Sequence, residues 1–171
     1  SQIKQNNTAQ PGDLLLLTKK LGVGILTTAE KKGILKAEHR FLAANQMMQL
    51  NKVGEKLGAC GEVHAMTDVT GFGLLGHLVE MTEGSGWGAT IDIKKVPLIT
   101  QDLYAYLEQQ SIPGGTNRNW DSYGHKIFFE NDAVAKTGKP MLADPQTSGG
   151  LLIAVSPEGL SAVQEILRES G

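Results

Sequence analysis

One stretch constrains the fold of this chain more than any other: TDVTGFGLLGH, over residues 67–77. Residues 63–66, directly before it, have the composition of a short buried strand. After it, Leu74, Leu75 and Leu78 fall on one face of a helix. The stretch therefore predicts a strand that runs through a glycine-containing turn straight into a helix. Such a turn leaves the first backbone N–H groups of the helix unpaired, and these groups attract anions.

Asp68 lies in this turn, where its own negative charge should repel a phosphate. In one interpretation Asp68 or Thr70 simply caps the helix. That interpretation leaves Gly71 and Gly73 unexplained, because both lower helix stability unless a close approach or an unusual dihedral is needed. In the other, a divalent cation such as Mg²⁺ bridges Asp68 to phosphate oxygens. The spacing alone leaves both interpretations open.

A second glycine turn, DPQTSGG, covers residues 144–150. Thr147 and Ser148 offer hydroxyl donors, and Gly149 with Gly150 could form a backbone nest for an anion. Since Asp, Pro, Ser and Gly all favour turns, an ordinary tight turn between two strands is the simpler interpretation of this segment taken alone.

The alternation of apolar patterns predicts a single α/β (α+β) domain, built in layers, over residues 13–171. Residues 1–12 are polar and aperiodic, and we expect a flexible lead-in or linker there. The expected strands are 13–19, 63–66, 89–93, 141–143 and 151–155. The expected helices are 21–32, 36–57, a helix from 74 that ends between 83 and 86, 103–109 and 157–169. A long polar loop is expected over 111–125.

Composition excludes several classes of function. With 16 basic and 18 acidic residues, the net charge of −2 lacks the basic excess of a nucleic-acid-binding protein. The longest apolar run, Leu151 to Val155, is too short to cross a bilayer. One cysteine, Cys60, allows no internal disulfide and fits a reducing cytoplasm. We therefore expect a cytoplasmic protein that binds neither nucleic acid nor membrane.

Other polar residues give weaker signals. Arg118 and Lys19 could hold a phosphate, but a solvated surface position is the commoner case for each. His77 and His125 have no partners at zinc-site spacing. The chain contains no P-loop, dinucleotide-binding or nucleophile-elbow motif. From the residues alone, the chain carries part of a phosphate site.

Four segments together resemble the selenophosphate synthetase (selenide, water dikinase) family: TDVTGFGLLGH (67–77), ADPQTSGGLL (143–152), GDLLLLTKKLGVGIL (12–26) and GGTNRN (114–119). The resemblance is to the C-terminal half of that family. It implies a layered α/β/α domain similar to the C-terminal domain of the aminoimidazole ribonucleotide synthetase superfamily. It also implies that the N-terminal half, with its glycine-rich loop and catalytic Cys or selenocysteine, is missing here.

The resemblance further implies a phosphotransferase reaction in which ATP, selenide and water give selenophosphate, AMP and orthophosphate with Mg²⁺. Asp68 matches the family's metal ligand, which favours the cation interpretation, and we expect no catalytic residue in this fragment. The expected phosphate-binding residues are Thr70, Gly71, Gly73, Thr147, Ser148, Gly149 and Gly150. The implied partner is the N-terminal half, within a homodimer of the full-length protein. Two alternatives stay open: a sister ATP-dependent synthetase or kinase, or a stand-alone binding module without catalysis.

Overall fold

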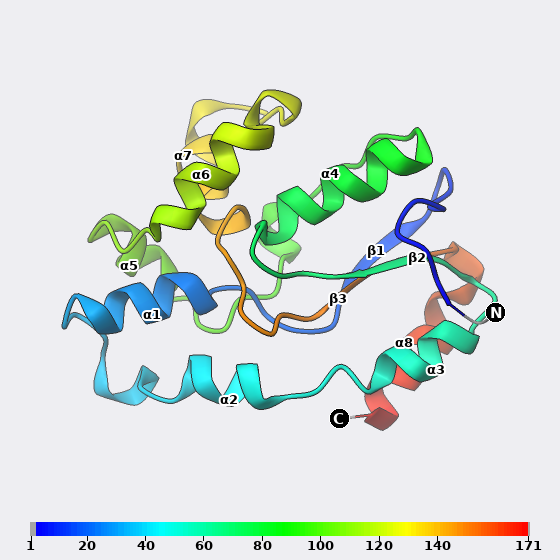
Figure 1. The fold of residues 1–171 in the computed structure, drawn as a ribbon, viewed down its shortest axis with the longest axis horizontal. Helices are drawn as coiled ribbons and strands as arrows, with labels where there is room; N and C mark the ends of the chain where they lie inside the picture. Colours follow the sequence, from blue (N-terminus) through cyan, green and yellow to red (C-terminus); the bar gives the residue numbers. More distant parts are fainter. Residues whose placement is uncertain (1–2, 171) are drawn as a thin grey trace.

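The computed structural model describes residues 3–170 and has a small antiparallel sheet with helices on both sides (Figure 1). Its strands are β1 (Leu14–Leu17), β2 (Val63–Asp68) and β3 (Leu151–Val155), in the order β1-β3-β2. β3 comes last in the sequence but lies at the centre, and all of its residues are buried. The sheet therefore joins segments from both ends of the chain.

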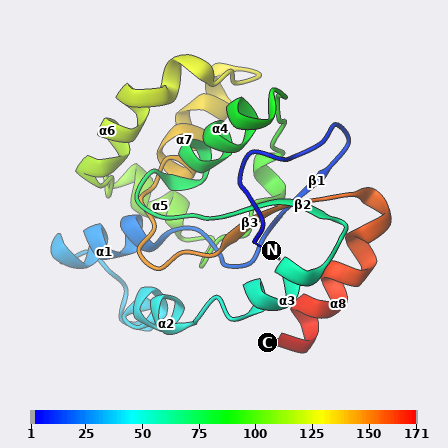
Figure 2. The ribbon, with the colours of Figure 1, turned by 45° about the vertical axis from the view of Figure 1, so that its right-hand side comes forward.

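Side chains of β3 alternate between two hydrophobic clusters, one on each face of the sheet. Ile153 and Val155 pack with α3 (Val53–Ala59) and α8 (Leu160–Ser170). On the other face, Leu152 and Ala154 pack in a larger cluster with helices α1 (Val23–Lys31), α4 (Gly73–Ser85), α5 (Leu103–Glu108) and α7 (Asp132–Leu142). Figure 2 shows α3 and α8 on one side and α4, α6 and α7 on the other. The layered α/β/α arrangement is confirmed.

Most strongly periodic segments form the expected elements. The strands expected over 13–19, 63–66 and 151–155 are confirmed, as are the helices over 21–32, 74 to 83–86 and 103–109. The helix expected from Pro157 begins with a 3₁₀ turn (Pro157–Gly159) and continues as α8. The Ser156 hydroxyl accepts a hydrogen bond from the Gly159 N–H at 3.1 Å and so caps this turn.

The single helix expected over 36–57 is wrong. The chain instead forms a 3₁₀ turn (Ala37–His39), α2 (Leu42–Met48) and then α3, with extended backbone at Gln49 (ψ 131°). At this break the Gln49 carbonyl accepts a hydrogen bond from Lys19 Nζ at 2.7 Å. The Asn51 amide donates to the Gly149 carbonyl at 2.9 Å. In a continuous helix, the Gln49 carbonyl and the Asn51 side chain would point in other directions and could not form these tertiary hydrogen bonds.

Three other expected elements differ in the structure. The loop expected over 111–125 is instead α6 (Gly114–Tyr123), followed by a 3₁₀ turn (Gly124–Lys126). The strand expected over 141–143 is the end of α7 and its C-cap. The strand expected over 89–93 is absent from the described residues, and a 3₁₀ turn (Ile93–Lys95) begins at its last residue. The second glycine turn therefore connects a helix to a strand, not two strands.

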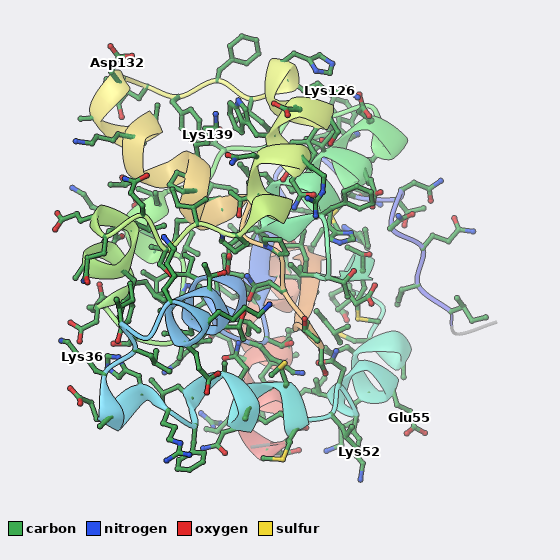
Figure 3. All side chains as sticks on the ribbon, turned by 60° about the vertical axis from the view of Figure 1, so that its left-hand side comes forward. Lys36, Lys52, Glu55, Lys126, Asp132 and Lys139 are labelled. Carbon is green, nitrogen blue, oxygen red and sulfur yellow. The ribbon has the colours of Figure 1, made fainter. Side chains whose placement is uncertain are left out.

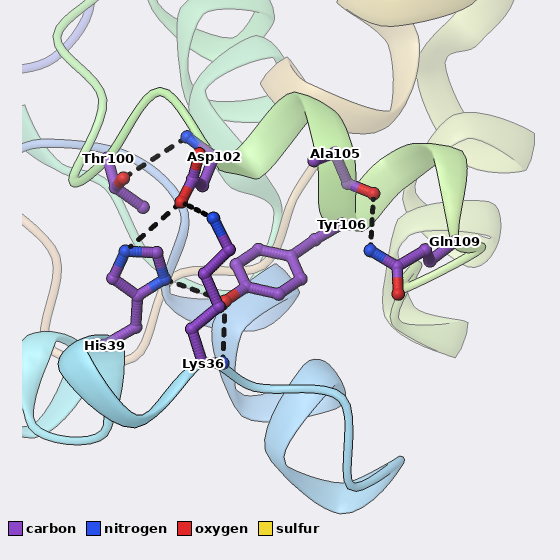
Figure 4. A network of polar contacts seen from close by, with 7 residues as sticks. All are labelled: Lys36, His39, Thr100, Asp102, Ala105, Tyr106 and Gln109. Atoms are coloured by element: carbon purple, nitrogen blue, oxygen red, sulfur yellow. Dashed lines mark hydrogen bonds and ion pairs between the residues drawn. The ribbon is translucent and has the colours of Figure 1, made fainter.

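A polar network holds the connection between α1 and α2 against α5 (Figure 4). The buried Tyr106 hydroxyl accepts from the Lys36 N–H at 3.0 Å and lies 2.7 Å from His39 Nδ1. Asp102 bonds Lys36 Nζ and lies 3.5 Å from His39 Nε2. Each polar group in this partly buried network has a partner, and the network joins the 3₁₀ turn (Ala37–His39) to α5.

Charged side chains of both signs extend from the surface. Figure 3 shows Lys52 and Glu55 at the start of α3, and Asp132 at the start of α7, pointing outward. No helix within residues 3–170 is long and apolar enough to cross a lipid bilayer.

Residues 5–10 of the expected lead-in lie next to β2 and β1. The Met66 N–H donates to the Gln5 carbonyl at 3.0 Å, and the Gln10 N–H donates to Asp13 Oδ2 at 2.8 Å. The division of the chain at residue 12 stays a prediction.

Candidate functional site

The two glycine turns lie side by side. Asp68, the last residue of β2, lies opposite Leu151, the first residue of β3. The turn that follows β2 therefore meets the turn that precedes β3. The Val69 N–H donates to the Gly150 carbonyl at 2.8 Å, and the Gln146 N–H donates to the Thr70 carbonyl at 3.0 Å. The structure therefore brings together the two turns that the sequence singled out separately.

Glycine is required at particular places in these turns. Gly73 has a φ of +71°, and a Cβ there would lie 2.8 Å from the carbonyl carbon of Ala143. A Cβ on Gly149 would meet the Val69 carbonyl oxygen, and one on Gly150 would meet the Lys19 backbone nitrogen. Gly71, in contrast, has no such neighbour within 4 Å. Three of the four glycines thus allow backbones to pack directly against each other.

Asp68 is exposed at the end of β2. Within residues 3–170 its carboxylate takes part in no hydrogen bond or ion pair, and α4 has no side-chain cap. The capping interpretation of Asp68 and Thr70 is therefore wrong. The Thr70 hydroxyl lies 3.2 Å from His77 Nε2, and His77 Nδ1 lies 3.2 Å from Glu80 Oε2.

Asp68 is an isolated candidate metal ligand. The described part of the chain contains no group of three or more His, Cys, Asp or Glu side chains that could hold a metal ion. Mg²⁺ requires six oxygen ligands, and one carboxylate supplies only one or two. A complete Mg²⁺ site at Asp68 therefore needs oxygens from a nucleotide, from water and from other protein groups.

The second turn caps α1 with its side chains. Asp144 Oδ2 accepts from the Gly24 N–H at 3.1 Å and from Gln146 Nε2 at 2.8 Å. Gln146 Oε1 in turn accepts from the N–H groups of Gly22 and Val23, each at 3.3 Å. α1 has no cap from its own N-cap residue, so the second turn satisfies its first N–H groups. Gly24 leaves room for Asp144, since a Cβ there would contact its Oδ1.

Asp144 is fully buried, and its Oδ1 has no hydrogen-bond partner among the described residues. Burial disfavours the charged carboxylate and raises the pKa of Asp144 from 3.8 to about 7. The hydrogen bonds from Gln146 and Gly24 oppose this rise but do not cancel it. Neither the burial nor the raised pKa of Asp144 is visible in the sequence, where Asp144 has the pattern of an ordinary turn residue.

The exposed part of the second turn presents the Thr147 and Ser148 side chains to solvent. Ser148 adopts a left-handed conformation with φ 50°. Its carbonyl accepts a hydrogen bond from Lys19 Nζ at 2.7 Å, and Lys19 is only 7% exposed. The expectation of a solvated Lys19 is therefore wrong. Burial lowers the pKa of Lys19, and its ammonium group links the second turn to the break after α2.

Asn119 of α6 connects both turns, and sequence analysis missed it. Its amide donates to the Gly71 carbonyl at 2.8 Å and to the Ala143 carbonyl at 3.1 Å. Asn119 is 7% exposed, whereas its neighbour Arg118 is exposed, as expected. Asn119 lies in the GGTNRN segment, but nothing in that segment distinguishes it from Asn117.

Comparison with known proteins finds both a family model and curated relatives that match this chain by sequence. The family model "AIR synthase related protein, C-terminal domain" matches residues 10–171. A selenide, water dikinase of Aeromonas salmonicida is 54% identical over 99% of this chain and 48% of that protein. One of Colwellia psychrerythraea is 50% identical over 100% of this chain and 48% of that protein. The chain spans about half the length of these curated relatives.

Solved structures with the same fold are more distant in sequence. Hydrogenase maturation protein HypE in complex with ATP has a TM-score of 0.63 and 21% identity, over 97% of this chain and 41% of that one. Thiamine-monophosphate kinase from Stenotrophomonas maltophilia has a TM-score of 0.62 and 17% identity, over 99% of this chain and 47% of that one. These likenesses confirm the fold.

The relatives confirm the resemblance to selenophosphate synthetases that the four segments indicated. The family model matches residues 10–171, which is nearly the whole chain. The chain therefore belongs to the AIR synthase related protein family and corresponds to the C-terminal domain of that family.

Proposed function

We propose that this chain is the C-terminal part of a selenide, water dikinase, which makes selenophosphate from ATP, selenide and water with release of AMP and orthophosphate. The observation that carries the proposal is the 54% identity to a relative of that name over 99% of the chain. The same relatives extend over about twice this length, which supports a missing N-terminal half that supplies the nucleophile.

In this proposal Asp68 supplies one carboxylate to Mg²⁺ bound with ATP. The exposed, unpaired carboxylate of Asp68 supports this role. The bound Mg²⁺ would neutralise phosphate charge, and the other ligands would come from ATP, water and the N-terminal half. Because one carboxylate makes a weak Mg²⁺ site, the chain by itself is catalytically inactive.

The two glycine turns would lie against the phosphates. Gly71, Thr147 and Ser148 are exposed next to Asp68, where their backbone and hydroxyl groups are open to a ligand. Gly73, Gly149 and Gly150 would act indirectly, by letting the two turns pack at backbone distance. Thr70 would orient the turn through its contact with His77. The full-length protein is proposed to be a cytoplasmic homodimer.

Phosphorus NMR on the full-length protein with ATP, Mg²⁺ and selenide tests the proposal. The expected result is a new selenide-dependent phosphorus signal, together with AMP and orthophosphate. A reaction without selenide is the control. ADP as the product, or turnover that does not depend on selenide, would assign the protein to a sister activity of the superfamily. Absence of any ATP turnover would favour a non-catalytic binding module.

A further inference from the structure

Lys19 is a buried cation to which the proposed function gives no role. Its Nζ donates to the Gln49 carbonyl and to the Ser148 carbonyl, each at 2.7 Å. Within residues 3–170 it forms no ion pair with a carboxylate. A buried charge without a charged partner is costly, so the surroundings of Lys19 favour the approach of an anion.

The sheet fixes Lys19 beside the second turn. The Thr18 N–H donates to the Leu151 carbonyl at 3.0 Å, and the Leu151 N–H donates to the Thr18 hydroxyl at 2.8 Å. A Cβ on Gly150 would lie 2.8 Å from the Lys19 Cβ. The Lys19 side chain therefore starts next to Gly150 and ends at the Ser148 carbonyl, and its ammonium group has a defined place at the turn.

The Ser148 carbonyl and the Gly149 N–H belong to the same peptide unit. In a trans peptide these two groups point in opposite directions. Since the carbonyl faces Lys19 Nζ, the Gly149 N–H points away from Lys19. Gly149 is buried, and its N–H donates no hydrogen bond within residues 3–170. Buried backbone N–H groups nearly always have an acceptor, so this N–H is suited to an acceptor from a ligand.

The hydrogen bond from Lys19 makes this peptide unit a better anion-binding group. An ammonium group polarises the carbonyl that it contacts, and the N–H at the other end of the peptide becomes a stronger donor. The positive charge of Lys19 and the positive end of the peptide dipole then attract the same anion. The exposed Thr147 and Ser148 place two hydroxyl groups at the same turn.

We propose that Lys19 is a positioning residue for phosphate binding and acts through the Ser148–Gly149 peptide. Its ammonium group holds and polarises the carbonyl end, and the N–H end donates to a phosphate oxygen of ATP. Gly149 thus gains a direct contact in addition to the packing that its missing Cβ allows. This inference rests on the proposed function only in taking ATP as the ligand of the two turns.

Lys19 also has a structural role, which the test has to separate from binding. Gln49 is the C-cap residue of α2, and a cation at the C-terminal end of a helix stabilises it. Removal of the ammonium group therefore lowers stability whether or not Lys19 affects a ligand. Measurements of ligand binding distinguish the two roles.

Steady-state kinetics of the full-length protein provide the first test. Lys19→Met keeps an unbranched side chain and removes the charge. We expect the KM for ATP to rise at least about 10-fold, because the phosphate loses a nearby cation and a polarised donor. The kcat should change less than about threefold, as expected when binding is weakened equally in the ground state and the transition state. Lys20→Met, at the exposed neighbour of Lys19, is the matched control and should leave both constants unchanged.

A purely structural role predicts a different pattern. Partial unfolding reduces the amount of active protein, which lowers kcat and leaves the KM for ATP as in the parent. That pattern in Lys19→Met would overturn the proposal.

The amide signal of Gly149 tests the contact without any substitution, and it decides the question even if Lys19→Met does not fold. Carbonyl-labelled serine with nitrogen-labelled glycine selects the Ser–Gly peptides in NMR spectra of the full-length protein. Saturating Mg–ATP should shift the Gly149 amide proton downfield, as a new hydrogen bond to an anion does. The Ser85–Gly86 peptide is the internal control, because the Gly86 N–H already donates to the Thr82 carbonyl at 2.9 Å. A Gly149 signal that moves no more than that of Gly86 would overturn the proposal.

Both measurements detect ATP binding whatever the product, so they separate this inference from the proposed function. ADP as the product, together with a raised KM in Lys19→Met, would overturn the dikinase assignment and support the role of Lys19. Selenide-dependent AMP formation with an unchanged KM in Lys19→Met would support the dikinase and overturn the role of Lys19.

Discussion

At the scale of single residues, the position of Asp68 defines what its substitution should do. Its carboxylate is exposed and unpaired among the described residues, so Asp68→Asn removes charge without breaking an internal contact. In the full-length protein we expect metal-dependent turnover to fall by at least about 100-fold, because the negative ligand that holds Mg²⁺ is lost. The measurement is selenide-dependent AMP formation across a range of Mg²⁺ concentrations.

Asp121→Asn is the matched control for this experiment. Asp121 is also exposed, lies on α6, and has no ion pair within residues 3–170. It should leave turnover unchanged, and both variants should unfold at the same urea concentration as the parent protein. Near-normal activity of Asp68→Asn would remove Asp68 from the metal site.

The raised pKa of Asp144 predicts that the free energy of unfolding depends on pH. Its pKa is about 7 in the folded protein and near its ordinary value of 3.8 when unfolded. The folded state therefore holds a proton that the unfolded state releases between these values. The stabilising contribution is complete below about pH 4 and is lost as the pH rises through 7. Its size is up to about 4 kcal/mol in the free energy of unfolding.

Asp144→Asn should remove this dependence. The amide oxygen still accepts from Gly24 and Gln146, while the side chain no longer ionises. In urea unfolding, the variant should gain stability relative to the parent as the pH rises from about 5 to about 8. A parent and variant that keep a constant difference over this range would show that Asp144 titrates normally.

Gly71 and Gly73 look equivalent in the sequence and should respond differently to alanine. Gly73→Ala forces a side chain into a left-handed backbone and against the Ala143 carbonyl carbon. We expect a loss of about 2–4 kcal/mol in the free energy of unfolding. Gly71→Ala meets open space and should cost less than about 1 kcal/mol. Chemical denaturation of both variants measures the difference, and equal losses would argue against the close packing of the turns.

At the scale of elements, α6 holds the two turns together through Asn119. Asn119→Ala leaves two carbonyls, those of Gly71 and Ala143, without their donor. The expected loss of stability is about 2 kcal/mol. Asn117→Ala, on the exposed face of the same helix, is the control and should change stability by less than about 0.5 kcal/mol. If both variants were equally stable, Asn119 would not couple the turns.

Hydrophobic periodicity predicted β3 and α4 but missed α6 and the break after α2. β3 and α4 are found from their leucines alone. α6 is missed because its buried face includes Thr116, Asn119 and Tyr123, which a hydrophobic pattern does not register. The break after α2 is also invisible, since the Lys19 and Asn51 hydrogen bonds that hold it depend on residues distant in sequence. Tertiary contacts decide these elements.

At the scale of the whole molecule, the motifs located both halves of the candidate site but not how they are joined. Each turn is recognisable from its glycines, whereas their contact follows from the position of β3 between β1 and β2. The caps that Asp144 and Gln146 provide for α1 depend on the same strand order. A short motif can therefore identify a turn. Which other segments contact that turn becomes clear only from the order of the strands in the sheet.

The same arrangement sets a limit on what this chain does alone. The described residues offer Mg²⁺ a single unpaired carboxylate at the turns and no three-ligand cluster. We therefore expect the isolated chain to bind Mg–ATP with a Kd above about 1 mM, which corresponds to less than about 4 kcal/mol. Titration calorimetry on the chain and on the full-length protein measures the two affinities. Binding should be much tighter in the full-length protein and should weaken there with Asp68→Asn. Tight binding by the chain alone would mean that its two turns form a self-contained nucleotide site, with the metal held mainly by the phosphates.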